Sequence, residues 1–380
     1  MEEWKEYKLG DVLTIKYGKD HKQLADGDIP IYGSGGIMRY GERSLYDGPS
    51  ILIPRKGSLN NIMYSGKPFW TVDTMFWTII NEEIANPLFV YYSICKKDFA
   101  SLNVGSAVPS LTVPVIEDVD ILLPSKFTQD KIVSILKSLD DKIEVNRRIN
   151  DNLEQQAQAL FKSWFVDFEP FRDQTFKESE LGMIPNGWHA AVLDELCSFI
   201  SRGLTPKYDE NSDELILGQT CVRNNVVTLD NARKHKPKQR TEKWVQQWDT
   251  LINSTGVGSL GRVGIAYFDM DNVAIDSHIT VVRPKSALVR HYVGRNLLNR
   301  QLEIENMAVG STGQTELPKE RVKSLPIMLP DEISLIRFNA IIEPIAYQLY
   351  RNIEESRRLA CLRDALLPRL MSGELTIADL

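Results

Sequence analysis

The sequence predicts an α+β chain with two repeated mixed α/β modules, each followed by a long α-helix, the two helices packed as an antiparallel coiled coil. Three observations predict this fold class. Residues 129–165 have a heptad pattern, the pattern returns near the end of the chain, and the motifs before the first helix also precede the second. We therefore expect a first module at 1–124, a first helix and linker at 125–184, a second module at 185–330 and a second helix at 331–380.

The heptad pattern predicts one long helix from Gln129 to Phe165 with a seam for a second helix. Apolar side chains recur there at alternating steps of three and four residues, which is the spacing of a coiled coil. In the last segment Asn352 takes the place of Asn146, and we expect these two asparagines to meet in a buried amide layer that fixes the register. The predicted seam residues are Leu139, Ile143, Asn146, Leu153, Leu160, Ile345, Leu349, Asn352, Leu359 and Leu366.

Short motifs outside the helices repeat in the same order. Gly57-Ser58-Leu59 is repeated as Gly258-Ser259-Leu260, and Val104-Gly105-Ser106 as Val309-Gly310-Ser311. In each half, an apolar strand that ends in proline follows these motifs and precedes the long helix. Because the modules repeat as well as the helices, we expect one duplicated arrangement rather than two unrelated domains.

The composition indicates ordinary globular cores. The chain is 43% hydrophobic and 25% charged, with a net charge of −6. Its four cysteines are scattered without a CxxC pair, so neither a disulfide framework nor a metal site is expected. No run of about 18 apolar residues occurs, and Met1–Trp4 begins no basic and apolar leader, so we expect a cytoplasmic protein with reduced thiols.

Two loops of the first module combine cations with glycine, a composition that suits contact with a phosphate backbone. One surrounds Gly18, and a merely solvated turn would explain it equally well. The other leaves a predicted buried strand at 50–54, and its side chains suit both phosphate positioning and contact with base edges. The candidate residues are Lys16, Lys19 and Lys22 in the first loop and Arg55, Lys56 and Ser58 in the second.

The second module is the only net basic segment, with 18 basic and 16 acidic side chains in residues 185–330. Six cations lie within residues 233–243, and we favour nucleic-acid binding over a solvated charged face because the rest of the module is balanced. Arg and Asn side chains can also contact guanine and adenine edges. The candidate residues are Arg202, Thr205, Lys207, Arg223, Asn224, Lys234, Lys236, Lys238, Arg240 and Arg262.

Several motifs resemble enzyme sites but fit structural elements better. Asn86-Pro87-Leu88-Phe89 is similar to the Asn-Pro-Pro-Tyr/Phe motif of amino-methyltransferases, but Leu88 replaces the second proline and the segment predicts a helix start. The glycines at 33–36 and 256–264 lack the spacing of a cofactor loop and predict a turn and a hairpin. Residues 69–77 predict a strand with core aromatics. With no P-loop, HExxH or serine elbow, we expect no catalytic residues.

The two-module layout resembles the specificity subunit of type I restriction-modification systems. The resemblance rests on Leu181-Gly182-x-Ile184-Pro185-x-Gly187-Trp188, on Gly258-Ser259-x-Gly261-Arg262-Val263-Gly264 and on the strand ending in Leu-Leu-Pro before the helix. It implies two target-recognition domains that each read half of a split, asymmetric DNA sequence, and two antiparallel spacer helices that set the gap. Three residues depart from a regular seam: we expect Arg363 and Ser356 to weaken it and Pro344 to bend or open the second helix.

The same resemblance implies the partners. It implies assembly with two adenine-methylating modification subunits and with restriction subunits that translocate on double-stranded DNA. The chain itself would be a non-catalytic DNA-recognition subunit that binds no cofactor, with S-adenosylmethionine, ATP and Mg bound by the partner subunits.

The helix length gives an expectation for the DNA. A helix of about 37 residues is roughly 55 Å long, against about 34 Å per turn of B-DNA. The half-sites are therefore expected about one to one and a half turns apart, on a similar face of the duplex. Inserting four residues near Asn150 should lengthen the spacer and leave both half-sites unchanged.

Two other classes of function stay open. A self-contained DNA amino-methyltransferase would use Asn86–Phe89 and would bind S-adenosylmethionine on the isolated chain. A protein-interaction scaffold would bind proteins with its modules and dimerise through its heptads. A steep fall of DNA affinity with salt would count against the scaffold.

Overall fold

The computed structural model describes residues 4–105, 109–236, 238–311 and 315–376. It divides into two compact units, unit 1 with Met1–Ile143 and Arg358–Leu380, and unit 2 with Glu144–Arg357. Each unit combines one module with a part of both long helices. Ser106, Pro237 and Met1–Glu3, which occur in the sequence motifs above, lie outside the described residues.

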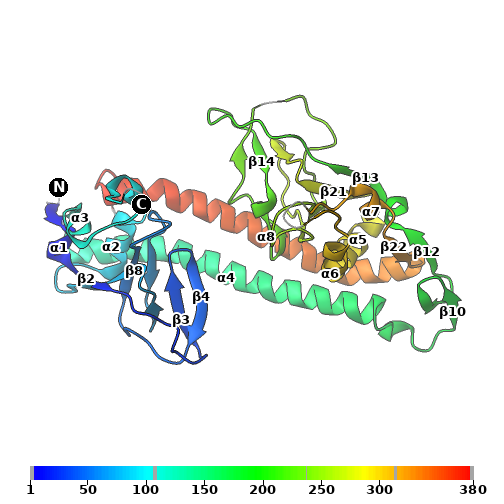
Figure 1. The fold of residues 1–380 in the computed structure, drawn as a ribbon, viewed down its shortest axis with the longest axis horizontal. Helices are drawn as coiled ribbons and strands as arrows, with labels where there is room; N and C mark the ends of the chain where they lie inside the picture. The colour runs from blue at the N-terminus through cyan, green and yellow to red at the C-terminus, as the bar shows by residue number, and fades with distance from the viewer. Residues whose placement is uncertain (1–3, 106–108, 237, 312–314, 377–380) are drawn as a thin grey trace. The chain divides into compact units, whose positions relative to one another are not determined.

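Unit 1 is built around two small β-sheets, with strand orders β2-β8-β5-β6 and β4-β3-β7, and a β1-β9 pair (Figure 1). The strand predicted at 50–54 is observed and buried throughout. The prediction of a single strand at 69–77 is wrong. A turn, in which Met75 N–H donates to the oxygen of Val72 (3.0 Å), divides the segment into β7 and β8. Its aromatic side chains are buried as expected. The elements are β1 Lys5–Lys8, α1 Leu9–Val12, β2 Leu13–Tyr17, β3 Ile29–Gly33, β4 Gly36–Gly41, β5 Ser50–Pro54, β6 Met63–Ser65, β7 Trp70–Thr71, β8 Met75–Ile80, α2 Pro87–Ile94, η1 Phe99–Leu102, α3 Val113–Glu117 and β9 Asp120–Leu123.

Unit 2 has a larger sheet, ordered β13-β21-β18-β19-β16-β15, and a second sheet, β17-β14-β20. The hairpin predicted at 256–264 is confirmed, since β18 and β19 pair antiparallel on either side of that loop. The elements are η2 Glu169–Phe171, β10 Phe176–Ser179, β11 Gly182–Pro185, β12 His189–Val192, η3 Leu193–Leu196, β13 Cys197–Arg202, β14 Leu215–Leu217, η4 Gln219–Cys221, β15 Val222–Arg223, β16 Asn225–Val227, β17 Arg233–Lys234, β18 Thr250–Asn253, β19 Val263–Ile265, β20 Val273–Ile275, β21 Ile279–Pro284, α5 Ala287–Asn299, α6 Gln301–Asn306, α7 Lys319–Lys323 and β22 Pro326–Leu329.

Two long helices complete the fold, α4 Lys126–Phe165 and α8 Glu332–Met371. In unit 1, Asp140 of α4 pairs with Arg363 of α8. In unit 2, Asn150 bonds to Asn352. Residue numbers therefore rise along one helix as they fall along the other, and the predicted α+β fold with an antiparallel helix pair is confirmed. No helix of the described residues is both long and apolar enough to span a membrane.

The predicted seam residues are all buried or half-buried. The expected contact between Asn146 and Asn352, however, is replaced by three other hydrogen bonds. Asn146 Nδ2 donates to Glu355 Oε2 (2.8 Å) and to Ser356 Oγ (3.3 Å), and Asn352 Nδ2 donates to Asn150 Oδ1 (2.8 Å). In an antiparallel pair, residue numbers rise along one helix as they fall along the other, so only a residue at the centre of the repeat faces its own equivalent. Asn146 lies slightly off that centre and therefore faces Ser356, about one turn beyond Asn352.

The expected weak points of α8 have structural partners. Arg363 Nη1 lies 2.7 Å from Asp140 Oδ1, so the charge at this seam position is compensated. Ser356 accepts the bond from Asn146 described above. α8 is one continuous helix across Pro344, so the expected local opening is not observed, and the proline is exposed. The alternative expectation, a bend at Pro344, stays a prediction.

The duplication extends to individual main-chain hydrogen bonds. Gly18 N–H donates to the oxygen of Met75 (2.9 Å), and Gly203 N–H donates to that of Ile279 (3.1 Å). A Cβ at either glycine would lie about 2 Å from a main-chain oxygen, 2.0 Å at Gly18 and 2.1 Å at Gly203, so each approach excludes a side chain. The two modules therefore share one backbone frame around the glycine loop.

The same frame fixes two further equivalences. Arg55 N–H donates to the oxygen of Thr74 (2.9 Å), and Ser254 N–H to that of His278 (2.9 Å). The oxygen of Arg55 accepts from Leu111 N–H (2.9 Å), as the oxygen of Ser254 does from Leu317 N–H (2.8 Å). Position 55 of unit 1 thus corresponds to position 254 of unit 2, and position 74 to position 278.

Candidate nucleic-acid interface

In unit 1 the two predicted basic loops lie side by side. The Arg55 guanidinium carbon is 5.7 Å from the centre of the Tyr17 ring, which is 56% exposed. Main-chain bonds from both loops to the turn at 72–75 hold them in this arrangement. A half-buried guanidinium over an exposed aromatic ring offers donors and a stacking surface together. Of the other candidates, Lys16, Lys19, Lys22, Lys56 and Ser58 are all exposed.

The β3–β4 turn extends this surface. Asn61 Nδ2, in the loop that begins at Arg55, donates to the main-chain oxygen of Ser34 (2.8 Å). On the other side of the hairpin, Arg39 Nη2 donates to the oxygens of His21 (2.6 Å) and Leu24 (2.9 Å). The glycines at 33–36, which the sequence predicts as a turn, therefore belong to a hairpin that contacts both basic loops. The contact of this hairpin with the two basic loops was not predicted from the sequence.

In unit 2 the cations of the predicted basic stretch meet the loop after Gly203. Lys236 N–H donates to the oxygen of Lys207 (2.8 Å), and Lys207 N–H donates to His235 Nδ1 (3.2 Å). Burial and the charge of Lys238 lower the pKa of His235, so it stays a neutral acceptor within the loop. Lys207, Lys234, Lys236 and Arg240 are exposed, whereas Lys238 is half-buried. Exposed cations held on one surface suit the phosphates of a nucleic acid.

Arg223 and Asn224 lie at the tip of a tight hairpin formed by β15 and β16. Val222 pairs with Val227 and Arg223 with Val226, which leaves Asn224 and Asn225 as the two turn residues. Their φ angles of 52° and 66° are those of a type I′ turn, which asparagine tolerates well. Both Arg223 and Asn224 are exposed. A rigid hairpin thus presents two side chains of the types that bind base edges.

Three predicted arginines have partners within the chain. Arg240 pairs with Asp271 (3.5 Å) at the surface. Arg202 donates to the main-chain oxygens of Ser277 (3.1 Å) and Leu317 (2.8 Å) and pairs with Glu316 (2.6 Å). Arg262 donates to the oxygen of Gly258 (2.6 Å). We expect the side chains of Arg202 and Arg262 to hold the surrounding loops in place, while Thr205 beside them is exposed.

His278 is a candidate that sequence reasoning missed. Its ring is 53% exposed, and its Nδ1 lies 2.6 Å from Oδ1 of the buried Asp276. The carboxylate fixes the ring orientation and leaves Nε2 on the exposed side. The sequence repeat matches Asp276 with Asp73, but this match is wrong: Val72 N–H donates to the oxygen of Tyr32 (3.0 Å) as Asp276 N–H does to that of Leu217 (3.0 Å), so Asp276 stands at the position of Val72. The contact to His278 depends on the turn between the two residues.

The segment that resembles a methyltransferase motif is structural. Asn86 is the N-cap of α2, and its Oδ1 accepts from the N–H groups of Leu88 (2.9 Å) and Phe89 (3.3 Å). Its Nδ2 donates to Asp130 (2.8 Å). The predicted helix start is confirmed, and the asparagine amide is engaged on both sides.

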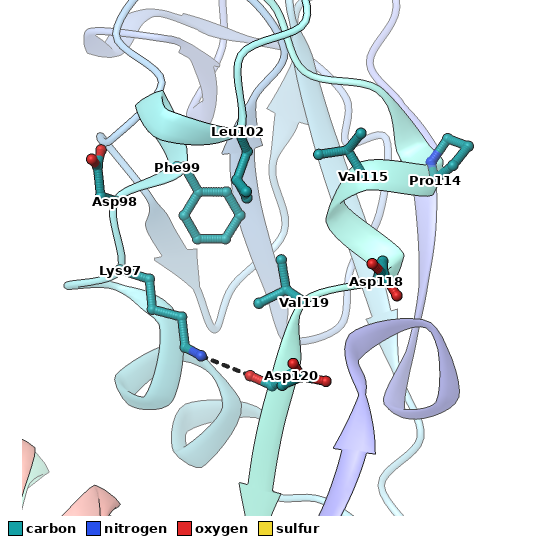
Figure 2. Close-up of a pocket in the computed structure, with 9 residues that line it drawn as sticks. All are labelled: Lys97, Asp98, Phe99, Leu102, Pro114, Val115, Asp118, Val119 and Asp120. Carbon is teal, nitrogen blue, oxygen red and sulfur yellow. Dashed lines mark hydrogen bonds between the residues drawn. The ribbon is translucent and has the colours of Figure 1, made fainter.

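A cavity of about 600 Å³ lies elsewhere in unit 1, between η1 and α3 (Figure 2). Phe99, Leu102 and Val119 line its apolar part, and Lys97 Nζ donates to the main-chain oxygen of Asp120 (2.7 Å). Asp98, Asp118 and Asp120 also line the cavity, and three acidic residues beside the single cation Lys97 do not suit a phosphate.

Comparison with known proteins gives one consistent family. Residues 1–155 match the family model of the type I restriction modification DNA specificity domain. The chain is 28% identical to the type I restriction enzyme MjaIX specificity subunit of Methanocaldococcus jannaschii, over 99% of this chain and 89% of the relative. It is 24% identical to the HindI specificity subunit of Haemophilus influenzae, over 80% of this chain and 81% of the relative.

A solved structure shares the fold. The type I restriction-modification S subunit from M. genitalium superposes with a TM-score of 0.60 at 15% identity, covering 97% of this chain and 96% of that one.

Proposed function

We propose that this chain is a specificity subunit of a type I restriction-modification system, which reads a split, asymmetric DNA sequence, one half with each unit, and directs partner subunits to it; its similarity to such subunits supports the proposal. One observation carries the proposal: the two modules share a backbone frame but present different side chains from it. Arg55 of unit 1 corresponds to Ser254 of unit 2, and Thr74 to His278. Identical half-sites would call for identical side chains, so the two halves of the target differ.

The cations support contact with the DNA backbone despite the net charge of −6. Phosphate contacts act over roughly one Debye length, about 8 Å at physiological salt, so local charge decides the attraction. In unit 1, exposed Lys16 and Lys56 are chain neighbours of the Arg55–Tyr17 pair, and in unit 2 the main-chain bond from Lys236 to Lys207 joins the basic stretch to the loop after Gly203. In each unit the cations would position the duplex while neighbouring side chains reach base edges.

Catalysis and cofactors are assigned to the partners in this proposal. The chain would act as the non-catalytic recognition subunit, with two modification subunits binding S-adenosylmethionine and restriction subunits binding ATP and Mg. The capping role of Asn86 supports this division, since its side chain is engaged within the fold. The duplicated frame supports two equivalent modification subunits. We propose that the assembly acts in the cytoplasm, where it would meet chromosomal DNA.

A map of methylated adenines in the source organism, with and without this gene, tests the function. Loss of methylation at one split motif is the expected result, and the motif itself is the target. An unchanged map in cells that express all subunits would contradict the proposal and favour the scaffold. Binding of S-adenosylmethionine by the isolated chain would favour the self-contained methyltransferase.

A further inference from the structure

We infer that the β3–β4 hairpin of unit 1 reads thymine, through contact of the exposed apolar side chains of Ile37 and Met38 with thymine methyl groups in the major groove. The inference rests on the proposed function and deepens it, because it assigns a reading element and a class of base to one half-site.

Both side chains are exposed where a folded chain would ordinarily bury them. Ile37 is 49% and Met38 60% exposed, and both lie on β4, an edge strand of its sheet. The strand register pairs Ile31 with Arg39 and Tyr32 with Ile37, so Met38 is an unpaired bulge residue. A bulge redirects a side chain away from the regular alternation of a strand. The geometry therefore presents two apolar groups near the tip of a hairpin.

Both cationic loops contact the hairpin. The loop of Arg55 and Lys56 contacts it through the bond from Asn61 to Ser34, and the loop of Lys19 and Lys22 contacts it through Arg39. An apolar tip next to two loops with exposed cations suits a DNA groove, where base edges lie close to the phosphates of the backbone. In the major groove, the 5-methyl group of thymine is the apolar feature that a side chain can recognise.

Unit 2 uses the equivalent position for a different chemistry. In unit 1, Ile31 pairs in parallel with Trp70 and antiparallel with Arg39. In unit 2, Ile216 has the same two kinds of partner, Ala274 in parallel and Arg233 antiparallel.

The hairpin β3–β4 is thus equivalent to β14–β17. Where unit 1 has a short turn, unit 2 inserts residues 218–232, which carry the β15–β16 hairpin with Arg223 and Asn224 at its tip. One place in the frame carries apolar side chains in unit 1 and polar ones in unit 2, as expected for an element that determines which bases are read.

A uracil substitution experiment tests the inference. The assembled complex of the full chain with its modification subunits first selects its split motif from a randomised duplex library. The variant Asn224→Ala relaxes one half of that motif and thereby identifies the other half as the half-site of unit 1. Each thymine of that half-site is then replaced by deoxyuridine, which lacks only the 5-methyl group.

We expect one or two of these replacements to weaken binding about fourfold each, the factor for burial of one methyl-sized group. A variant with Ile37→Ser and Met38→Ser should bind the thymine duplex more weakly by a similar factor and should no longer distinguish deoxyuridine from thymine. The control Leu302→Ser, at a 72% exposed position of unit 2, should keep the full discrimination. Retained binding to the half-site of unit 2 shows that the double variant is folded.

Three results would overturn the inference: a unit 1 half-site without an A·T pair, wild-type binding that ignores the methyl group, or a double variant that still senses it. The second of these would point to an apolar wedge between base steps, which does not depend on the methyl group. If the library yields no enriched sequence at all, the proposed function itself fails.

Discussion

Replacing Asp140 of α4 by alanine should destabilise the helix pair in unit 1, whereas the same change at its neighbour Asp141 should not. Asp140 Oδ1 lies 2.7 Å from Arg363 Nη1, and its Oδ2 accepts from the hydroxyl of Tyr92 (2.6 Å). Burial and this bond raise the pKa of Tyr92, so the hydroxyl stays a donor. Asp141 pairs only with Lys137, one helical turn earlier and largely exposed.

The magnitude follows from the two partners. A hydrogen bond to a charged group contributes about 1.5–3 kcal/mol when shielded, and an exposed ion pair contributes about 0–1 kcal/mol. The side chains of Arg363 and Asp140 are 25% and 32% exposed, so the ion pair counts toward the lower range. We expect Asp140→Ala to cost about 2 kcal/mol and Asp141→Ala less than about 0.5 kcal/mol.

Hydrogen exchange on the full chain measures this difference locally, which avoids the assumption that the two units unfold together. Amides of α4 and α8 within unit 1 should exchange about thirtyfold faster in Asp140→Ala, the factor for about 2 kcal/mol. Arg363→Leu should have a smaller effect than Asp140→Ala, because Asp140 keeps its bond from Tyr92. Equal exchange in the Asp140 and Asp141 variants would refute the assignment of this contact as a stabilising one.

Three further outcomes are expected. In the first, four residues are inserted at two places, between Asn150 and Asp151 and between Arg351 and Asn352, so that the helix partners stay in register and the helix pair lengthens by about 6 Å. The methylation motif should then gain about two base pairs of spacer with unchanged half-sites. A changed half-site would contradict the role of the helices. Lys19→Gln should lower the slope of log affinity against log salt by about 1, whereas Lys137→Gln on α4 should leave it unchanged. Burial lowers the pKa of His291 to about 3 in the folded chain, so as the pH falls below about 6.5 the unfolded chain binds a proton at His291 before the folded chain does. Urea denaturation should therefore show the free energy of unfolding of unit 2 falling by about 2 kcal/mol between pH 7 and pH 5. The fall should be smaller in His291→Leu.

The helices were the most predictable part of the fold because their spacing is local information. Steps of three and four residues in the sequence become one buried face, and the predicted helix at Gln129–Phe165 is observed from Lys126 to Phe165. The partners across the seam were less predictable. Asn146 bonds to Glu355 and Ser356 because the antiparallel arrangement, and not the repeat in the sequence, decides which residues face one another.

The interface was predictable only in part, for a related reason. Exposed lysines are recognisable from composition, but Arg202 is engaged by Glu316 and by main-chain oxygens that lie far away in the sequence. In the sequence, Ile37 and Met38 look like ordinary strand residues, because their exposure depends on the edge position of β4 and on a bulge. Pairing patterns decide these features, and a single sequence does not record them.

The shared frame also explains how one chain can hold two different specificities. Main-chain hydrogen bonds hold the glycine loops and the strand ends in both units, and these bonds do not depend on which side chain stands at position 55 or 254. Side chains at these positions can therefore change without loss of the fold. The hairpin between β3 and β4 tolerates a change in length as well, as the insertion at 218–232 in unit 2 demonstrates. A new half-site then requires only substitutions or insertions at the tips of a conserved frame, so exchanging the β3–β4 turn for residues 218–232 should transfer base preference between the two half-sites.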